Sequence, residues 1–120
     1  MTVRPTEIRL RKKSRILVVA FDDGTEFQFS HEYLRVHSPS AEVKGHGPGQ
    51  DTLQTGKEDV QIIGVEPVGH YAARLVFDDG HDSGLYSWTY LHELGTSMEA
   101  NWQRYLDRLR AAGYARKKPQ

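Results

Sequence analysis

The sequence predicts an α+β fold: a small antiparallel β-rich domain with two pseudo-repeated hairpin-plus-short-helix units and a C-terminal helix. Three observations support this prediction. The motif Phe-Asp-Asp-Gly occurs at residues 21–24 and again at 77–80, and β-branched or aromatic residues lead into both copies. Asp-Asp-Gly is typical of tight turns, because glycine adopts a positive φ without steric cost. The helical spacing of apolar residues is clearest near the C-terminus.

The similarity between the two copies continues beyond the turn. A short strand follows each turn, at residues 26–29 and 84–86, and is followed by a serine and then a Tyr-Leu pair. Serine caps helices well, so we predict a short helical turn after each hairpin. The second copy has one extra residue, which predicts a longer loop or a bulge at residues 81–84. The matching residues are Ser30, Tyr33 and Leu34 in the first copy and Ser87, Tyr90 and Leu91 in the second.

The other strands follow from local patterns. Residues 7–11 alternate between polar and apolar and predict a half-exposed strand that turns into the apolar strand 16–21. Residues 60–65 and 71–77 predict a second antiparallel pair. Between these pairs lies a loop at residues 37–59, rich in Ser, Pro, Gly and His. A loop of this length inside a small domain is usually functional or mobile.

The clearest helix is at the C-terminus. Thr96-Ser97-Met98-Glu99 matches a capping box, in which Thr96 caps the helix and Glu99 reaches back to it. Gly113 ends the helix, and residues 113–120 form a flexible basic tail. We predict a single domain over residues 1–120, with its core at about 5–112. The apolar stripe of the helix consists of Met98, Trp102, Tyr105, Leu106 and Leu109.

Composition excludes several classes of protein. The 120 residues include no cysteine, which excludes disulfides, a thiolate nucleophile and cysteine-ligated zinc or iron–sulfur centres. No apolar run is long enough to span a bilayer, and the N-terminus lacks the apolar core of a signal peptide. We therefore expect a cytoplasmic protein without a membrane partner.

The net charge of zero hides an uneven distribution. Residues 1–15 carry six basic residues and one acidic residue, and residues 104–120 carry the same numbers. The residues between them carry four basic and fourteen acidic residues. The basic residues near the N-terminus alternate with apolar ones, as on the solvated face of a strand, and the acidic centre repels phosphate. We therefore expect a protein partner rather than nucleic acid.

His81 is the first candidate for a binding residue. It lies in the sequence Asp78-Asp79-Gly80-His81-Asp82-Ser83, where carboxylates can orient its ring and favour its charged form. The same groups are also ligands for a divalent ion. The first copy of the turn has Thr25 at this position. The turn therefore explains the aspartates but not the histidine.

The glycine-rich loop at residues 36–49, which contains His37 and His46, is the second candidate. It lacks the spacing of a P-loop or of a dinucleotide-binding loop. The chain has no Gly-x-Ser-x-Gly elbow and no His-Glu-x-x-His pair, so no catalytic constellation is present and we expect no enzyme. Trp88, between two tyrosines, is either part of a stacking surface or part of the core, and the core is the more frequent place for such residues.

Two motifs carry a family resemblance: Ser-Pro-Ser-Ala-Glu-Val-Lys-Gly-His-Gly-Pro at 38–48 and Phe-Asp-Asp-Gly-His-Asp-Ser-Gly-Leu-Tyr-Ser-Trp at 77–88. Over most of residues 5–112 the chain resembles the gamma-butyrobetaine hydroxylase-like N-terminal domain family, a bacterial domain of unknown function in its stand-alone form. In the hydroxylases this domain precedes an iron- and 2-oxoglutarate-dependent catalytic domain that holds the iron site. The domain also occurs fused to P-loop carriers of the iron–sulfur assembly type. The resemblance thus implies an adaptor role linked to iron or iron–sulfur biology, without oxygenase activity.

The resemblance also implies where a zinc site would lie. In the hydroxylases three cysteines and a distant histidine bind zinc, and the corresponding residues here are Ser38, Ser40, Val43 and His81. Of these four side chains, His81 alone is a good zinc ligand.

Two hypotheses of function follow. The first is a non-catalytic binding module whose surface combines the second hairpin loop with the long loop. The second is a metal-binding domain that holds zinc or iron through His81, with His37 or His46 and carboxylates. The candidate binding residues are Ser38, Ser40, His46, Asp79, His81, Asp82, Ser83 and Trp88.

Overall fold

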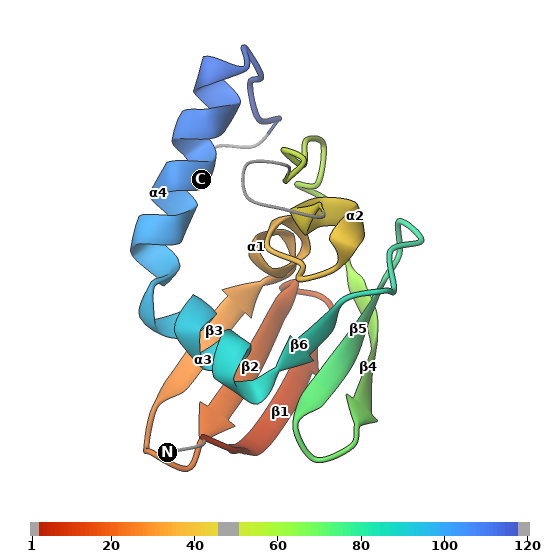
Figure 1. Ribbon diagram of the computed structural model, residues 1–120, viewed down its shortest axis with the longest axis vertical. Coiled ribbons are helices and arrows are strands. Elements are labelled where there is room, and N and C mark those ends of the chain that lie inside the picture. Colours follow the sequence, from red (N-terminus) through yellow and green to blue (C-terminus); the bar gives the residue numbers. More distant parts are fainter. Residues whose placement is uncertain (1–2, 46–50, 118–120) are drawn as a thin grey trace.

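The computed structural model describes residues 3–45 and 51–117 and places six strands and four helices among them (Figure 1). The strands form two three-stranded antiparallel sheets, in the orders β1-β2-β3 and β4-β5-β6. The α+β class predicted from the sequence is confirmed. The strands are β1 (Pro5–Arg11), β2 (Ile16–Phe21), β3 (Glu26–Ser30), β4 (Ile62–Val68), β5 (Ala72–Phe77) and β6 (Leu85–Ser87), and the helices are α1 (His31–Val36), α2 (Ala41–Lys44), α3 (Trp88–Thr96) and α4 (Met98–Ala111).

Each sheet contains one copy of the repeated unit. Gly24 and Gly80 both have a φ near +90° and close turns of the same form, with their N–H groups donating to the carbonyls of Phe21 and Phe77. The two copies differ after the turn. β3 pairs with β2 from Glu26 onward, whereas β6 begins only at Leu85. The longer loop predicted for the second copy is therefore confirmed.

A serine caps the helix that follows each hairpin, as its hydroxyl satisfies a backbone N–H that has no partner inside the helix. The hydroxyl of Ser30 accepts from the N–H of Tyr33 at 3.0 Å, and that of Ser87 accepts from Tyr90 at 3.0 Å. Both caps were predicted from the sequence. Helix α3 is longer than the predicted single turn, because Leu91 and Leu94 continue its buried face.

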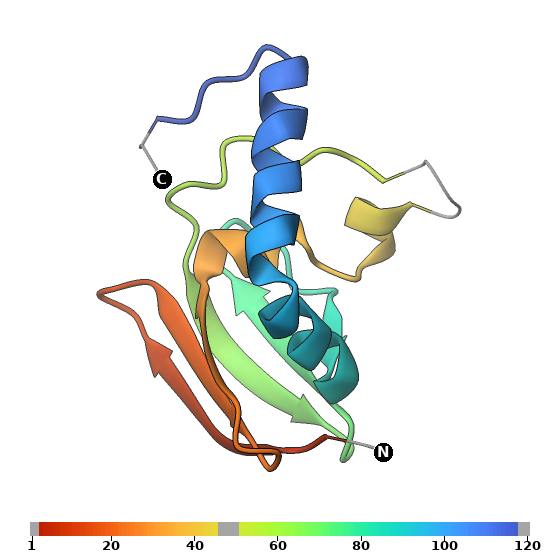
Figure 2. The same cartoon turned by 90° about the vertical axis from the view of Figure 1, so that its left-hand side faces the viewer.

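The core lies between the two sheets and the helices that follow them. Apolar side chains of β2 and β5 alternate toward it, and aromatic residues fill the space beside them. Helix α4 extends beyond the sheets and lies beside α1, where a second, smaller cluster forms (Figures 1 and 2). This smaller cluster consists of Val36, Tyr105, Leu106 and Leu109.

The predicted capping box at Thr96 is wrong. Thr96 is the last residue of α3, and its hydroxyl donates to the carbonyl of Glu93 at 3.1 Å instead of accepting from α4. Ser97 separates the two helices and makes no side-chain cap. A threonine inside a helix often bonds back to the preceding turn in this way. Gly113, at φ +77°, ends α4 as predicted.

Three other details differ from the predicted elements. The long loop contains the short helix α2, which Ser40 caps through its hydroxyl. β4 begins two residues later than predicted and continues to Val68. After Gly113 the chain turns back: Arg116 pairs with Glu32 on α1, and the N–H of Lys117 donates to Glu58 at 2.7 Å. The predicted mobility of the tail stays a prediction, since these contacts say nothing about motion.

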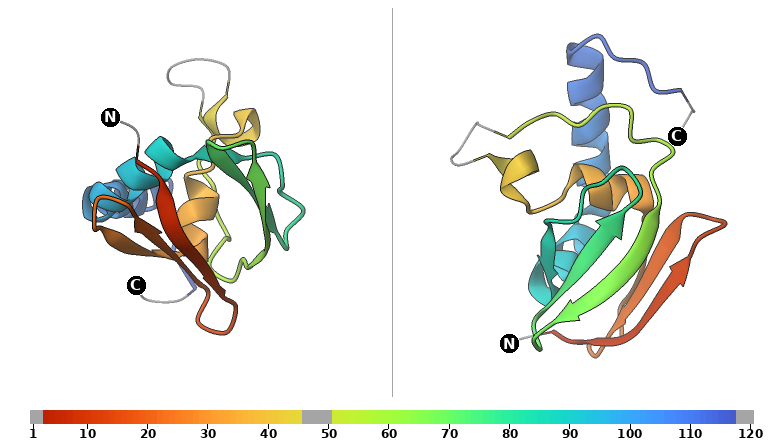
Figure 3. Two further views of the ribbon diagram at one scale, coloured as in Figure 1. Left: turned by 90° about the horizontal axis from the view of Figure 1, so that it is seen from below. Right: turned by 90° about the vertical axis from the view of Figure 1, so that its right-hand side faces the viewer.

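Figure 3 shows that the two sheets lie side by side, with the long loop and α2 at one end of β5 and β6. The loop at residues 81–84 lies at that same end. Within the described parts of the chain, no helix is long and apolar enough to cross a membrane.

Candidate functional site

His81 is buried where the second hairpin meets the long loop. Its side chain is only 2% exposed, and its ring contacts two residues of the long loop. Nε2 lies 2.8 Å from the hydroxyl oxygen of Ser38, and Nδ1 lies 3.2 Å from a carboxylate oxygen of Glu42. The N–H of His81 donates to Asp79 at 3.1 Å, which fixes the backbone as the chain leaves the turn.

These contacts define the protonation of the ring. A carboxylate only accepts, so Nδ1 carries a hydrogen and donates it to Glu42. Nε2 is then the acceptor, and the hydroxyl of Ser38 donates to it. Burial lowers the pKa of His81, and the positive charge of Arg35 lowers it further, against the opposing effect of Glu42 and Asp79. The imidazole is therefore neutral at neutral pH.

The serines extend these contacts into a network of hydrogen bonds. Ser83 donates to Glu42 at 3.0 Å, so its oxygen accepts from Ser40 at 2.7 Å. Ser40 in turn accepts from the N–H of Glu42, and Ser38 accepts from the N–H of Ser40. Ser38, Ser40 and His81 are buried, whereas Glu42 and Ser83 are exposed at the surface. We call the group the serine–histidine cluster: Ser38, Ser40, Glu42, His81 and Ser83.

Asp79 forms a second polar centre next to this cluster. One of its carboxylate oxygens accepts from Arg35 at 2.9 Å and from Lys57 at 2.7 Å. Burial alone would raise the pKa of Asp79, but the hydrogen bonds from Lys57 and His81 and the charge of Arg35 lower it overall. Arg35 also donates to Gln54 at 3.1 Å. Asp79 thus connects α1, the long loop and the hairpin.

The other predicted binding residues lie apart from the cluster. Asp82 is exposed and pairs with Arg74 of β5 at 3.2 Å. Trp88 is buried in the core, and its indole N–H donates to the carbonyl of His70 in the β4–β5 turn, which is the far end of β5 from His81. His46 lies outside the described residues. The structure therefore brings together Ser38, Ser40, His81 and Ser83, places Asp79 beside them, and separates Asp82 and Trp88.

Sequence reasoning missed Arg35 and Lys57, and it included Glu42 only as part of the loop 38–46 without singling it out. Glu42 lies only two residues from Ser40, but 39 residues separate it from His81. Arg35 and Lys57 lie 44 and 22 residues from Asp79. No local sequence pattern connects residues so far apart. The one local signal was Glu42 itself, an acidic residue in the first turn of a short helix.

Comparison with known proteins identifies the family. The protein-family model described as "Gamma-butyrobetaine hydroxylase-like, N-terminal" matches residues 8–92 of this chain. These residues include the whole second hairpin and the serine–histidine cluster. The chain belongs to this family. A search of curated proteins found no match.

Solved structures resemble this gamma-butyrobetaine hydroxylase-like domain over most of its length. One NMR structure is 51% identical, covers 96% of this chain and 86% of its own, and has a TM-score of 0.82. A second NMR structure is 46% identical, covers 100% and 94%, and has a TM-score of 0.85. A crystal structure from Acidithiobacillus ferrooxidans ATCC 23270, described as a protein with unknown function of the DUF971 family, is 40% identical, covers 77% and 92%, and has a TM-score of 0.65.

The zinc positions implied by the family fit a metal poorly in this gamma-butyrobetaine hydroxylase-like domain. Both ring nitrogens of His81 already have hydrogen-bonding partners. Within residues 3–45 and 51–117, no group of three or more His, Cys, Asp or Glu side chains is placed to hold an ion. The buried side-chain polar atoms without a partner in those ranges belong to Arg9, Arg15 and His31, none of them in the cluster. Hydrogen bonds therefore hold the loop to the hairpin here.

The order Ser38, His81, Glu42 resembles the nucleophile, base and orienting acid of a hydrolase. Access argues against that chemistry. Ser38 is 0% exposed, and a Cβ at Gly84 would lie 2.5 Å from its hydroxyl oxygen, so the space beside it is filled. The same oxygen also accepts from a backbone N–H. A substrate carbonyl has no path to this hydroxyl, and the arrangement serves to join two segments of the chain.

Proposed function

We propose that this gamma-butyrobetaine hydroxylase-like domain is a non-catalytic binding module that receives an extended protein segment along β3. The observation that carries the proposal is a groove of about 710 Å³ that Gln28 and Ser30 of that strand line together with Ile16 of β2. Its walls come from the first sheet, from α1, from the α3–α4 junction and from Arg116, whose guanidinium lies 5.3 Å from the centre of the Trp102 ring and pairs with Glu32. The residues that matter most are Ile16, Gln28, Ser30, Tyr33, Met98 and Trp102.

The first argument is that β3 is an edge strand. It pairs with β2 on one side, and no backbone hydrogen bond connects its other side to another described segment. An edge of this kind presents N–H and C=O groups to which an incoming strand can bond. The backbone bonds supply affinity, and the groove beside the strand selects the side chains.

The second argument is the chemistry of the groove. Met98 and Trp102 are partly buried, and together with Ile16 they offer an apolar surface to alternate side chains of an added strand. Methionine adapts its shape to different apolar partners. Glu99 lies at the rim, where it favours a basic residue near the end of the segment. The partner is therefore an extended segment with alternating apolar side chains and a lysine or arginine beside them.

This proposal relocates the binding surface that the sequence predicts. His81 is buried and Asp79 is held in ion pairs with Arg35 and Lys57, so replacing either of them tests folding more than binding. A cytoplasmic location and a link to iron–sulfur assembly stay part of the proposal. The identity of the partner tests both.

The experiment selects extended peptides from a display library and locates their binding site. We expect selected peptides to slow amide hydrogen exchange at residues 26–30 and to shift the NMR signals of Met98 and Trp102. Met98→Lys places a charge in the groove and should weaken binding about tenfold or more, because burying an unpaired charge is unfavourable. Gln103→Lys adds the same charge to an exposed position of α4 outside the groove and should leave affinity unchanged.

Thermal unfolding of both variants confirms that each is folded before binding is compared. Peptides that protect other segments, or that bind Met98→Lys as well as the parent protein, would contradict the proposal.

A further inference from the structure

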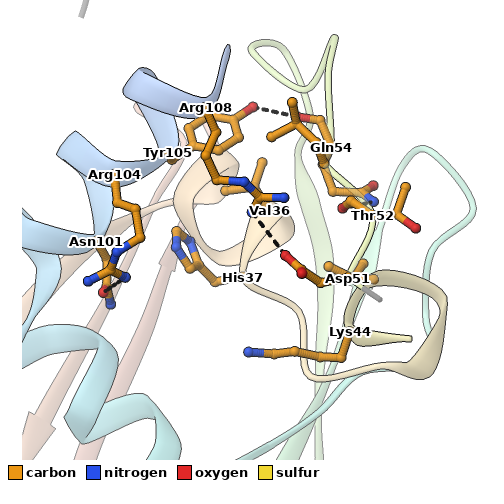
Figure 4. Close-up of a pocket in the computed structure, with 12 residues that line it drawn as sticks. Val36, His37, Lys44, Asp51, Thr52, Gln54, Asn101, Arg104, Tyr105 and Arg108 are labelled. Carbon is orange, nitrogen blue, oxygen red and sulfur yellow. Dashed lines mark hydrogen bonds and ion pairs between the residues drawn. The ribbon is translucent and has the colours of Figure 1, made fainter. Parts of the chain in front are cut away.

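A second cavity, of about 200 Å³, lies between the end of α1, helix α2 and helix α4 (Figure 4). It is on a different side of α4 from the groove of the proposed function and does not depend on it. Figure 4 shows three basic side chains, Lys44, Arg104 and Arg108, arranged around His37. Arg104 and Arg108 belong to the basic C-terminal region of the sequence, and Lys44 lies on the long loop.

Two of these cations have no carboxylate partner among residues 3–45 and 51–117. Arg104 donates to the side-chain oxygen of Asn101 at 3.0 Å, and the ammonium of Lys44 lies 5.2 Å from the centre of the Tyr90 ring. Arg108 differs, because it pairs with Asp51 at 3.0 Å. Lys44 and Arg104 therefore supply positive charge that no ion pair among the described residues engages, with Glu93 lining the neighbouring space beside them.

His37 forms the inner wall between them. Its Nδ1 lies 2.9 Å from the carbonyl oxygen of Tyr33, so Nδ1 carries a hydrogen and donates it. In the neutral ring Nε2 is then an acceptor, and in the charged ring it becomes a donor. The C-terminal end of α1 thus presents a group that can donate to an anion after taking up one proton.

The volume and the charges limit the ligand. A neighbouring space of about 260 Å³ shares His37, Lys44 and Arg104, and Glu93 also lines it. A cavity of about 200 Å³ is below the usual size for a drug-like ligand, but it accommodates a tetrahedral oxyanion with a few attached atoms. Guanidinium groups bind carboxylate and phosphate oxygens in pairs, and an ammonium adds a point charge.

We propose that this cavity binds a phosphate group, either free or at the end of a small organic molecule, through Lys44, Arg104 and His37. The phosphate dianion matches the two cations that lack a carboxylate partner, whereas Arg108 is already paired with Asp51. A small phosphate-bearing ligand is large enough to fill this cavity of about 200 Å³.

The site predicts that binding depends on pH. Burial lowers the pKa of His37, and Lys44, Arg104 and Arg108 lower it further, while the hydrogen bond to Tyr33 opposes them. A bound dianion offsets the positive charges and raises the pKa, so His37 takes up a proton on binding. Proton uptake by His37 favours binding as pH falls, whereas protonation of the phosphate dianion, whose second pKa is about 6, opposes it, so the direct measure is the ring pKa of His37 with and without phosphate. Charged and titratable groups from four elements and the long loop face His37. They are Tyr33 on α1; Lys44 on α2; Asp51 on the long loop; Tyr90 and Glu93 on α3; and Arg104, Tyr105 and Arg108 on α4.

The test is an NMR titration of the full chain at constant ionic strength, with chloride replaced by inorganic phosphate. Parallel titrations use glycerol phosphate, malonate and a short single-stranded DNA. We expect saturable shifts at His37, Lys44 and residues 101–108, and a His37 ring pKa that rises when phosphate is bound. Glycerol phosphate binding more tightly than phosphate identifies an organic phosphate as the ligand, and the reverse identifies the free ion.

Variants locate the site. Arg104→Gln and Lys44→Gln should each weaken phosphate binding about tenfold, as the loss of a charge-assisted hydrogen bond predicts. Arg110→Gln removes the same charge from α4 but lies outside both cavities, pairs with Asp107, and should leave affinity unchanged. Equal losses in all three variants, shifts spread over the basic surface, or preference for malonate or DNA over both phosphates would overturn the proposal.

Discussion

Replacing His81 with alanine is predicted to destabilise the domain and to flatten the dependence of its stability on pH. The variant leaves the hydroxyl of Ser38 without its acceptor in a fully buried place and removes the donor to Glu42. A buried polar group without a partner costs about 1–3 kcal/mol, and the empty volume of the ring adds to that. We therefore expect a loss of about 3 kcal/mol in the free energy of unfolding, or about 10 °C in Tm.

The pH dependence gives an independent measurement. The pKa of His81 is lowered in the folded protein, so between that value and 6.5 the unfolded chain binds more protons than the native protein. Stability is then fully present above pH 6.5 and is lost as pH falls toward the folded pKa. His31 and His37, whose pKa values burial also lowers, contribute in the same direction. His81→Ala removes one of these three contributions, so its stability should fall less between pH 7 and 5.5.

Urea unfolding at several pH values measures both effects, with His70→Ala as the control because His70 is exposed in the β4–β5 turn. The control should match the parent protein within about 0.5 kcal/mol. A loss below about 1 kcal/mol for His81→Ala, or an unchanged pH slope, would refute the structural role assigned to this ring.

Two further predictions concern packing and metal. Gly95→Ala should be destabilising by about 1–2 kcal/mol in urea unfolding: alanine gains about 1 kcal/mol of helix propensity, but its Cβ would lie 2.4–2.6 Å from three ring atoms of Phe27. Adding Phe27→Leu should recover part of the loss, and a Gly95→Ala variant as stable as the parent would contradict the packing of α3 on β3. Untagged protein should retain less than about a tenth of an equivalent of zinc or iron in metal analysis, and neither ion should raise its Tm, because both nitrogens of His81 are already bonded. Stoichiometric binding would show that the cluster rearranges around an ion.

Local chemistry explains which parts of the fold were predictable. The Asp-Asp-Gly turns and the serine caps depend on residues within four positions of one another, and both copies formed as predicted. The end of α4 at Gly113 depends on one backbone angle and was likewise predictable. The start of α4 was not predictable, because Thr96 and Ser97 are both good N-cap residues. In the structure α3 continues past the buried Leu94 and ends at Thr96.

The candidate site was predictable only in part. The sequence indicated that His81 is not required by its turn, and it indicated the serines of the long loop. It did not indicate that the ring faces inward, because its partners Ser38 and Glu42 lie 43 and 39 residues away. Trp88 fills the core for the reason that aromatic residues usually do, which is the large apolar area that they bury. The partner of the domain stays a prediction.

The two hairpins use the same backbone device for different ends. Asp23 accepts from the N–H of Thr25, and Asp79 accepts from the N–H of His81, so the turn fixes the main chain in both copies whatever side chain follows the glycine. That position is therefore free to diverge. In the first copy it closes the turn on itself through the hydroxyl of Thr25, and in the second it fastens a distant loop. The same main-chain turn thus serves as an attachment point in the second hairpin, where a histidine stands at the position that a threonine occupies in the first.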